Sequence, residues 1–221
     1  MFASWSFAEI GGRLQIAPMK KDDIMKAINN LPEDYKEIYS VNLQKDKKVA
    51  LGVNVLAVII MFLMAVPMHF IVPISNLFSM EKGDGAYFLR FGVLVILSVA
   101  YIILHEFVHG IAMKICGTKK IKYGFTGIYA YAGSDDCYDK SAYIFIALAP
   151  VVLWGVVLAV INPFVSAEWF WVVYFIQISN ISGAAGDFFV TCRFSRMPKD
   201  ILVKEIPGVN VEIDIIGPQI G

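Results

Sequence analysis

Long apolar blocks alternate with short polar segments along this chain. Four blocks are predominantly apolar over more than about 20 residues, the length at which a helix rising about 1.5 Å per residue crosses a bilayer core. They are Val49–Val72, Tyr87–Cys116, Tyr143–Val165 and Trp169–Cys192. The pattern therefore predicts an α-helical membrane protein with about four transmembrane helices.

The polar segments before the first span and after the second carry weaker patterns. Residues from Lys20 to Lys48 alternate in charge and are interrupted at Leu31-Pro32, which predicts a short helical appendage before the first span. After the second span, Lys120–Tyr123 alternates between polar and apolar positions, and Phe125–Tyr131 is rich in β-branched and aromatic residues. This loop predicts a small β-hairpin on the cytoplasmic face of the membrane, between helices two and three.

The segment after the fourth span has a period of two. Val209 to Ile215 alternates between apolar and polar residues, which predicts one exposed strand. The chain accordingly divides into a cytoplasmic N-terminal appendage (residues 1–48), a four-span membrane domain (residues 49–192) and a cytoplasmic C-terminal tail (residues 193–221).

Composition supports a membrane protein and excludes several other classes. Of the 221 residues, 57% are hydrophobic and only 17% are charged, against about 25% charged in an average soluble domain. The net charge is zero, so nothing indicates a nucleic-acid partner. The three cysteines show no paired spacing that would indicate disulfides or a thiolate metal site, and residues 1–19 lack the apolar run of a signal peptide.

The positions of lysine and arginine predict the orientation in the membrane. Positive residues concentrate in the cytoplasmic loops of membrane proteins. Here they flank the start of the first span and follow the second and fourth spans, whereas the opposite side offers Lys82 and Arg90 beside acidic residues. We therefore expect an integral plasma-membrane protein with both termini in the cytoplasm, and Arg90 extending toward the outer headgroups.

The strongest chemical signal is His105-Glu106-Phe107-Val108-His109, inside the second span. On a helix, side chains four residues apart lie one above the other, so both imidazoles can bind one Zn²⁺. Glu106 then lies where it can take a proton from a water ligand of the metal, the arrangement of zinc peptidases. Ionisable side chains are costly inside a membrane, so their presence there indicates a function.

A catalytic zinc site usually has three protein ligands and one open position. His69 is the only other histidine, and it lies near the outer end of the first span, on the order of 20 Å from His105 along the membrane normal. Asp187 lies about as far along the fourth span as His105 lies along the second, and these two spans run in the same direction. We therefore expect Asp187 to be the third ligand.

These residues predict one catalytic Zn²⁺ on His105, His109 and Asp187, with Glu106 as the general base that passes a proton to the leaving amine. Asn180 lies two helical turns before Asp187 on nearly the same face. It is a candidate oxyanion or substrate contact, and an interhelical hydrogen bond is an equal alternative. An extended substrate could pair with an edge of the hairpin.

The motifs together resemble a known family. His105-Glu106-x-x-His109-Gly110 late in a membrane helix, the hairpin that follows, Ala147-Leu148-Ala149-Pro150, and the stretch from Asn180 to Asp187 are similar to the site-2 protease family of intramembrane zinc metalloproteases. The prolines that this family has between its Asn and Asp are replaced here by small residues from Gly183 to Ala185.

A second resemblance is closer. Ser182 to Asp187, followed by Arg196-Met197-Pro198-Lys199-Asp200, resembles the C-terminal signature of a bacterial family of uncharacterised zincin membrane peptidases. The resemblance covers roughly Leu31 to Val211. It implies a zinc-dependent membrane peptidase in which Asp187 occupies the position of the third ligand.

Three function classes remain open at the level of sequence. The first is a zinc metallopeptidase that acts on a membrane-protein or peptide substrate in or near the bilayer. The second is a non-catalytic scaffold or regulator whose zinc joins the helices. The third is a small cation transporter, which the lack of inverted repeats disfavours.

Overall fold

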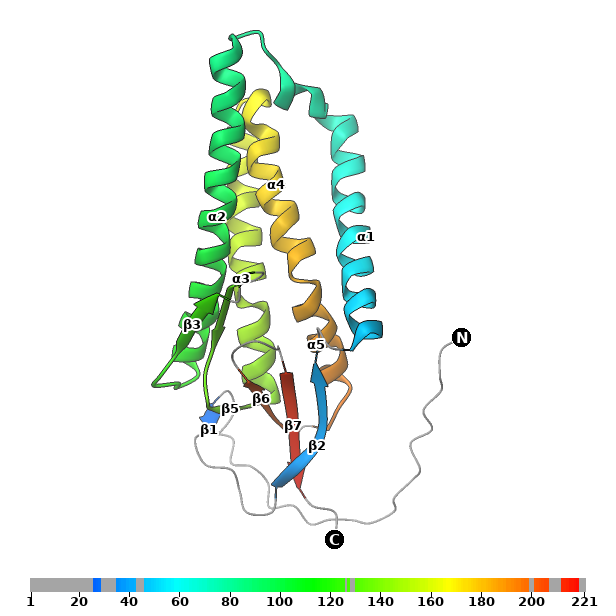
Figure 1. The fold of residues 1–221 in the computed structure, drawn as a ribbon, viewed down its shortest axis with the longest axis vertical. Helices are drawn as coiled ribbons and strands as arrows, with labels where there is room; N and C mark the ends of the chain where they lie inside the picture. The colour runs from blue at the N-terminus through cyan, green and yellow to red at the C-terminus, as the bar shows by residue number, and fades with distance from the viewer. Residues whose placement is uncertain are drawn as a thin grey trace.

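The computed structural model describes residues 26–28, 35–42, 46–125, 127, 130–198, 201–206 and 212–218. Upright helices form a bundle, and the strands gather at one end of it (Figure 1). We call this the sheet end. At the opposite loop end, the short 3₁₀ helix η2 (Ile74–Phe78) connects the first two helices.

Within the described residues, three helices are long and apolar enough to cross a membrane. They are α1 (Lys47–Ile71), α2 (Asp84–Ile115) and α3 (Lys140–Ile161), the last extended by the 3₁₀ helix η3 (Asn162–Phe164). They confirm the first three predicted segments as long apolar helices. Large apolar side chains along them point outward, and no residue of α1 is buried within the chain. Such continuous apolar faces are expected where a helix contacts lipid.

The fourth predicted span is not one helix. It is divided into α4 (Ala167–Gly183) and α5 (Ala185–Ser195), which meet at Ala184 with φ −81° and ψ 14°. Glycine stabilises helix poorly, and the small residues at this junction offer little side-chain packing to hold the chain straight. As a result, the described part of the chain has three helices of spanning length instead of four, and Asp187 lies in the first turn of α5.

The helix ends follow ordinary capping rules. The side chain of Asp46 accepts hydrogen bonds from the backbone N–H groups of Lys48 and Val49 at the start of α1. Asp139 does the same for Ala142 at the start of α3, with a distance of 2.8 Å. Gly117 ends α2 with φ 98°, a left-handed conformation that glycine adopts without steric cost.

A five-stranded antiparallel sheet lies at the sheet end, with strand order β1-β5-β6-β7-β2. Its strands are β1 (Ala27–Ile28), β2 (Tyr35–Asn42), β5 (Cys137–Asp139), β6 (Leu202–Ile206) and β7 (Glu212–Pro218). The predicted helical appendage is therefore wrong for residues 27–28 and 35–42; residues 20–25, 29–34 and 43–45 lie outside the described part. Pairing with β7 over a long sequence distance outweighs the local charge pattern of β2.

The predicted C-terminal strand is present but differently placed. β7 includes Glu212 to Ile215 of the predicted strand and confirms it there, whereas residues 209–211 lie outside the described part. The strand lies inside the sheet, between β6 and β2. Its residue Ile216 is buried in a small cluster with Leu202 and Cys137.

The predicted hairpin after α2 is confirmed. β3 (Lys122–Phe125) pairs antiparallel with β4 (Ala130–Gly133), in a register that places Lys122 opposite Gly133. Gly124 lies within β3, and Gly127 has the positive φ of a turn.

Two apolar cores hold the bundle. At the sheet end, buried side chains of α2, α3, α5 and β6 meet, with Ala142, Phe194 and Val203 fully inaccessible. At the loop end, Trp171 and Val172 of α4 pack with Leu77 of η2. The indole N–H of Trp171 also donates to the carbonyl of Val72 at 2.9 Å, which fixes α4 against the end of α1.

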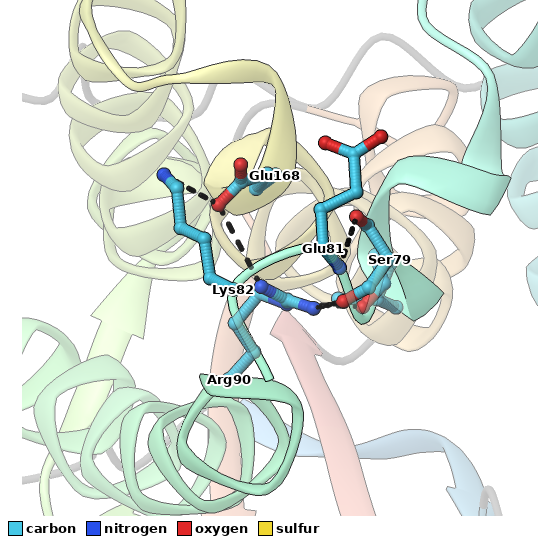
Figure 2. A network of polar contacts seen from close by, with 6 residues as sticks. Ser79, Glu81, Lys82, Arg90 and Glu168 are labelled. Atoms are coloured by element: carbon cyan, nitrogen blue, oxygen red, sulfur yellow. Dashed lines mark hydrogen bonds and ion pairs between the residues drawn. The ribbon is translucent and has the colours of Figure 1, made fainter. Parts of the chain in front are cut away.

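A polar network closes the loop end (Figure 2). Arg90 is only 1% exposed, so the expectation that it extends toward headgroups is wrong. Its guanidinium donates to the backbone carbonyls of Leu77, at 3.1 Å, and of Ser79. Glu168 at the start of α4 lies between Arg90 and Lys82, with N–O distances of 3.7 Å and 3.0 Å. The network joins α2, α4 and the η2 connection.

Candidate metal centre

Three side chains from two helices converge near the sheet end of α2. His105 and His109 extend from the same face of α2, with ring centroids 4.9 Å apart, and Asp187 extends from the first turn of α5. Their ligand atoms all lie within 4.8 Å of one another. The helix break at Ala184 sets the position of Asp187, because it separates the start of α5 from α4.

This donor set fits a zinc ion. Zinc binds imidazole nitrogen and carboxylate oxygen at about 2.0–2.2 Å, so a tetrahedral ion separates its ligand atoms by about 3.4 Å. The ligand atoms here lie within 4.8 Å of one another, so a shift of about 1 Å would bring them to that spacing. Three protein ligands leave a fourth position open, as in catalytic zinc sites. His105, His109 and Asp187 would hold the ion.

The ring of His109 is oriented by the backbone of α3. Its Nδ1 lies 2.9 Å from the carbonyl oxygen of Ile146. A carbonyl only accepts hydrogen bonds, so Nδ1 carries the proton and donates it. The lone pair of His109 is therefore on Nε2, the other ring nitrogen, which is the atom left for a metal.

The ring of His105 is oriented by a side-chain relay. Its Nδ1 lies 2.8 Å from the hydroxyl of Tyr101, one helical turn earlier. The Tyr101 hydroxyl donates to Oδ1 of Asn180 at 2.9 Å, and Nδ2 of Asn180 donates to the carbonyl of Val151 at 3.0 Å. Asn180 is completely buried in this relay.

Glu106 lines a groove on the outer side of the same helix. The groove has a volume of about 710 Å³ and runs between α2 and the β3–β4 hairpin. Among the described residues that line it, Glu106 is the only charged one, and most of the others, such as Phe107 and Phe125, are apolar. A carboxylate at the side of an apolar groove and next to a ligand histidine can act on a chain that lies in the groove.

Tyr123 of β3 borders the same carboxylate. Its hydroxyl lies against the backbone of Gly110, so closely that a methyl group at Gly110 would overlap it. Gly110 and Glu106 are one helical turn apart on α2. Burial, and secondly the negative charge of Glu106, raise the pKa of Tyr123 above its ordinary value. The phenol therefore keeps its proton at neutral pH and remains a hydrogen-bond donor beside Glu106.

The structure brings together most of the residues that the sequence singled out. His105, His109, Asp187 and Asn180 gather within one region of the bundle, as the sequence led us to expect. His69 lies elsewhere, in the last turn of α1, where its Nδ1 accepts from the backbone N–H of Ile74.

Three contributors at the site were not assigned a role from sequence. They are Tyr101, the Ile146 carbonyl and Tyr123. The spacing of four residues between Tyr101 and His105 was a usable signal, because such pairs meet on one helix face. The contacts of Ile146 and Tyr123 depend on which helix and hairpin neighbour α2, which no local pattern reveals.

Two histidines, Glu106 and a third candidate ligand, Asp187, are the residue types that zinc-dependent peptidases use with a His-Glu-x-x-His helix. Comparison with known proteins agrees. Residues 98–202 match the protein family described as "Putative zincin peptidase". The matched region contains His105, Glu106, His109 and Asp187, together with Tyr101 and Asn180 of the relay.

A curated relative is found in Pyrococcus woesei. It is described as an uncharacterized 24.7 kDa protein in the gap 5′ region, and it is 29% identical over 130 residues. The alignment covers 57% of this chain and 55% of the relative, so the chain spans about half the length of the protein it matches. No solved structure matches the chain at a significant level.

Proposed function

We propose that this protein is a zinc-dependent membrane metallopeptidase that hydrolyses peptide bonds in or near the bilayer. The observation that carries the proposal is the convergence of His105, His109 and Asp187 within 4.8 Å, beside the groove that Glu106 lines. The family match supports the same class, and the relation to site-2 proteases rests on the motifs alone.

The chain's own residues supply most of the proposed chemistry. A bound zinc ion would polarise the scissile carbonyl and lower the pKa of a water ligand toward about 7. Glu106 accepts the proton of the attacking water and then delivers it to the leaving amine. The hydroxyl of Tyr123 beside Glu106 is placed to donate a hydrogen bond to the substrate. Asn180 acts through His105 rather than on substrate, because both ends of its amide are already hydrogen-bonded.

The groove indicates the form of the substrate. Its aromatic and aliphatic lining favours an apolar segment, and its position along the hairpin favours an extended one. Helical peptide bonds are internally hydrogen-bonded and poorly exposed, so a membrane substrate must unwind locally before it enters. An extended segment can then pair with a hairpin edge while its side chains occupy the groove.

The proposed setting is the plasma membrane, with the sheet end in the cytoplasm. Lysines and arginines concentrate at this end: Lys47 and Lys48 at the start of α1, Lys114 at the end of α2 and Arg193 at the end of α5. The bias matches the rule that cytoplasmic flanks are positive. The metal centre would then lie in the cytoplasmic half of the bilayer, within reach of water.

The test uses the full chain in lipid nanodiscs and compares the parent with Glu106→Gln and Asp187→Ala. Zinc content is measured by metal analysis, and cleavage with quenched fluorescent casein as an unfolded probe. We expect Glu106→Gln to keep its zinc and lose cleavage, because the ligands remain and the general base is gone. Asp187→Ala should lose both.

The same comparison separates the alternatives. Cleavage that survives in Glu106→Gln contradicts the mechanism. A parent that binds zinc but cleaves neither casein nor a panel of membrane-inserted peptides fits a zinc-stabilised scaffold. A parent with no affinity for zinc contradicts the metal site itself.

A further inference from the structure

Helix α3 contains no residue of the ligand set, yet its backbone contacts the groups that orient both ligand histidines. The carbonyl of Ile146 meets His109, and the carbonyl of Val151 meets Asn180 of the relay to His105. We infer that α3 positions both ligand histidines of the metal centre. Pro150 leaves the Ile146 carbonyl free to orient His109. The Val151 carbonyl holds Asn180 of α4, which orients His105 through Tyr101 of α2. The inference rests on the proposed zinc site and assigns residues that its ligand set does not include.

Pro150 explains why the Ile146 carbonyl is available. In an α-helix, the carbonyl of one residue accepts from the N–H four residues later. The residue four after Ile146 is Pro150, which has no N–H and whose ring pushes that carbonyl away from the helix axis. A buried acceptor without a partner is costly. His109 donates to it at 2.9 Å. The carbonyl that the proline leaves without a helical donor therefore orients the ring of a candidate zinc ligand.

The relay to His105 has only one consistent set of donors. The Val151 carbonyl only accepts, so the amide nitrogen of Asn180 must face it. Oδ1 of Asn180 then faces Tyr101 and accepts its single hydroxyl proton. The Tyr101 oxygen is left to accept, and His105 must donate to it from Nδ1.

Both imidazole rings are thus held in the same tautomer. Each carries its proton on Nδ1 and presents the Nε2 lone pair, the form in which imidazole binds zinc. A free imidazole would rotate and exchange tautomers, so fixing it in advance lowers the cost of binding. The two contacts on α3 are only five residues apart, at Ile146 and Val151, so one helix coordinates both orientations.

The test measures zinc affinity by chelator competition on the full chain in nanodiscs. Tyr101→Phe removes the hydroxyl of the relay and little volume. Pro150→Ala restores an N–H that competes for the Ile146 carbonyl. We expect each variant to bind zinc about 10- to 100-fold more weakly than the parent, the usual loss when a partner of a ligand histidine is removed.

Two matched controls isolate the effect. Gln177 lies one turn before Asn180 on α4 and donates to the α3 carbonyl of Gly155 at 3.2 Å, without reaching a histidine. Pro67 is also inside a helix, in α1. Gln177→Leu and Pro67→Ala should therefore keep the zinc affinity of the parent. A loss as large as in Tyr101→Phe and Pro150→Ala would show a general packing effect and overturn the inference.

¹⁵N NMR of histidine-labelled, zinc-free protein reports the tautomer of each ring, which a change in packing alone would not alter. The chain has three histidines, so the spectrum is simple. At alkaline pH, His105 and His109 should show the Nδ1-protonated form in the parent, and His105 should shift toward the Nε2-protonated form in Tyr101→Phe. If Tyr101→Phe changed neither the tautomer of His105 nor the zinc affinity, the inference would be overturned. A parent that fails to bind zinc would instead overturn the proposed function.

Discussion

Helix α2 carries two polar clusters inside a largely apolar bundle, and they are built differently. Around Arg90, the guanidinium contacts two backbone carbonyls and the carboxylate of Glu168, so its charge and its donors have partners (Figure 2). Fifteen residues later, or about 22 Å along the helix, His105 and His109 converge on Asp187, with ligand atoms of the three residues within 4.8 Å of one another.

The difference separates a structural cluster from a functional one. Polar groups in a low-dielectric interior must be satisfied, and the Arg90 cluster satisfies itself with protein atoms. At the metal centre, three electron-pair donors face one another, an arrangement that gains most from a cation between them. The supporting contacts there even orient the donors toward one another. The two clusters should therefore respond oppositely to substitution.

The largest expected effect is at the metal centre. His109→Ala removes a ligand, and we expect zinc affinity to fall by more than about 1,000-fold, beyond the loss typical of a supporting residue. The measurement is chelator competition on the nanodisc-embedded chain. The free energy of unfolding of the zinc-free variant should also fall by about 1–3 kcal/mol, because the buried carbonyl of Ile146 is left without its donor. A variant that kept the affinity of the parent would remove His109 from the ligand set.

The Arg90 cluster should show the reverse behaviour. Arg90→Met leaves Glu168 and two carbonyls without their buried partner, and we expect the free energy of unfolding to fall by about 3 kcal/mol. Zinc affinity of the folded fraction should not change. Denaturant unfolding in lipid-like micelles measures the first quantity and chelator competition the second.

Lys82→Met is the matched control, because Lys82 contacts the same carboxylate but is 66% exposed. Its loss should cost less than about 1 kcal/mol. Equal losses in the two variants would contradict the view that burial makes the Arg90 contact important.

The long helices and the residues of the metal centre could be predicted from the sequence. The apolar blocks predicted about four helices of spanning length, of which the described residues contain three, and the spacing of His105, Glu106 and His109 indicated the metal helix. Asp187 followed from matching its depth to that of His105, which works because helices rise by a fixed amount per residue. These predictions depend on local periodicity and length.

The parts that sequence missed depend on long-range partners. Arg90 was expected at the headgroups because nothing local shows that the η2 connection folds back to cover it. The β2 segment was read as helix because its partner β7 lies more than a hundred residues away. The break at Ala184 was read as part of a continuous span, since small residues fit a close-packed helix as well as a helix junction.

A smaller effect distinguishes two glycines of α2. A side chain at Gly110 would overlap the Tyr123 hydroxyl, whereas nothing lies within 4 Å of one at Gly92. We expect Gly110→Ala to move Tyr123 away from Glu106, at a cost of about 1 kcal/mol or slightly more in unfolding free energy, and to slow casein cleavage. Gly92→Ala should be neutral or slightly stabilising. Unfolding and cleavage assays on both variants check this, and equal behaviour would argue against a close contact at Gly110.

The smallest effect belongs to a polar pair that lies in neither cluster. Asp135 is exposed and accepts a hydrogen bond from Nζ of Lys122 at 2.7 Å, which holds the pKa of Asp135 below its ordinary value of 3.8. A lowered folded-state pKa means that the pair stabilises the protein above the unfolded pKa and loses this contribution as the pH falls through the folded pKa. At pH 7 the contribution is fully present.

Even so, Asp135→Asn should leave unfolding and zinc affinity unchanged within error at pH 7, because solvent screens an exposed pair. The informative measurement is a carboxylate NMR titration, in which Lys122→Met should return the pKa of Asp135 toward its ordinary value. A clear loss of stability in Asp135→Asn would mean that polar contacts act alike wherever they lie. An unchanged protein would confine the large effects to the two clusters on α2, where the polar side chains are buried or half-buried and depend on a protein or metal partner.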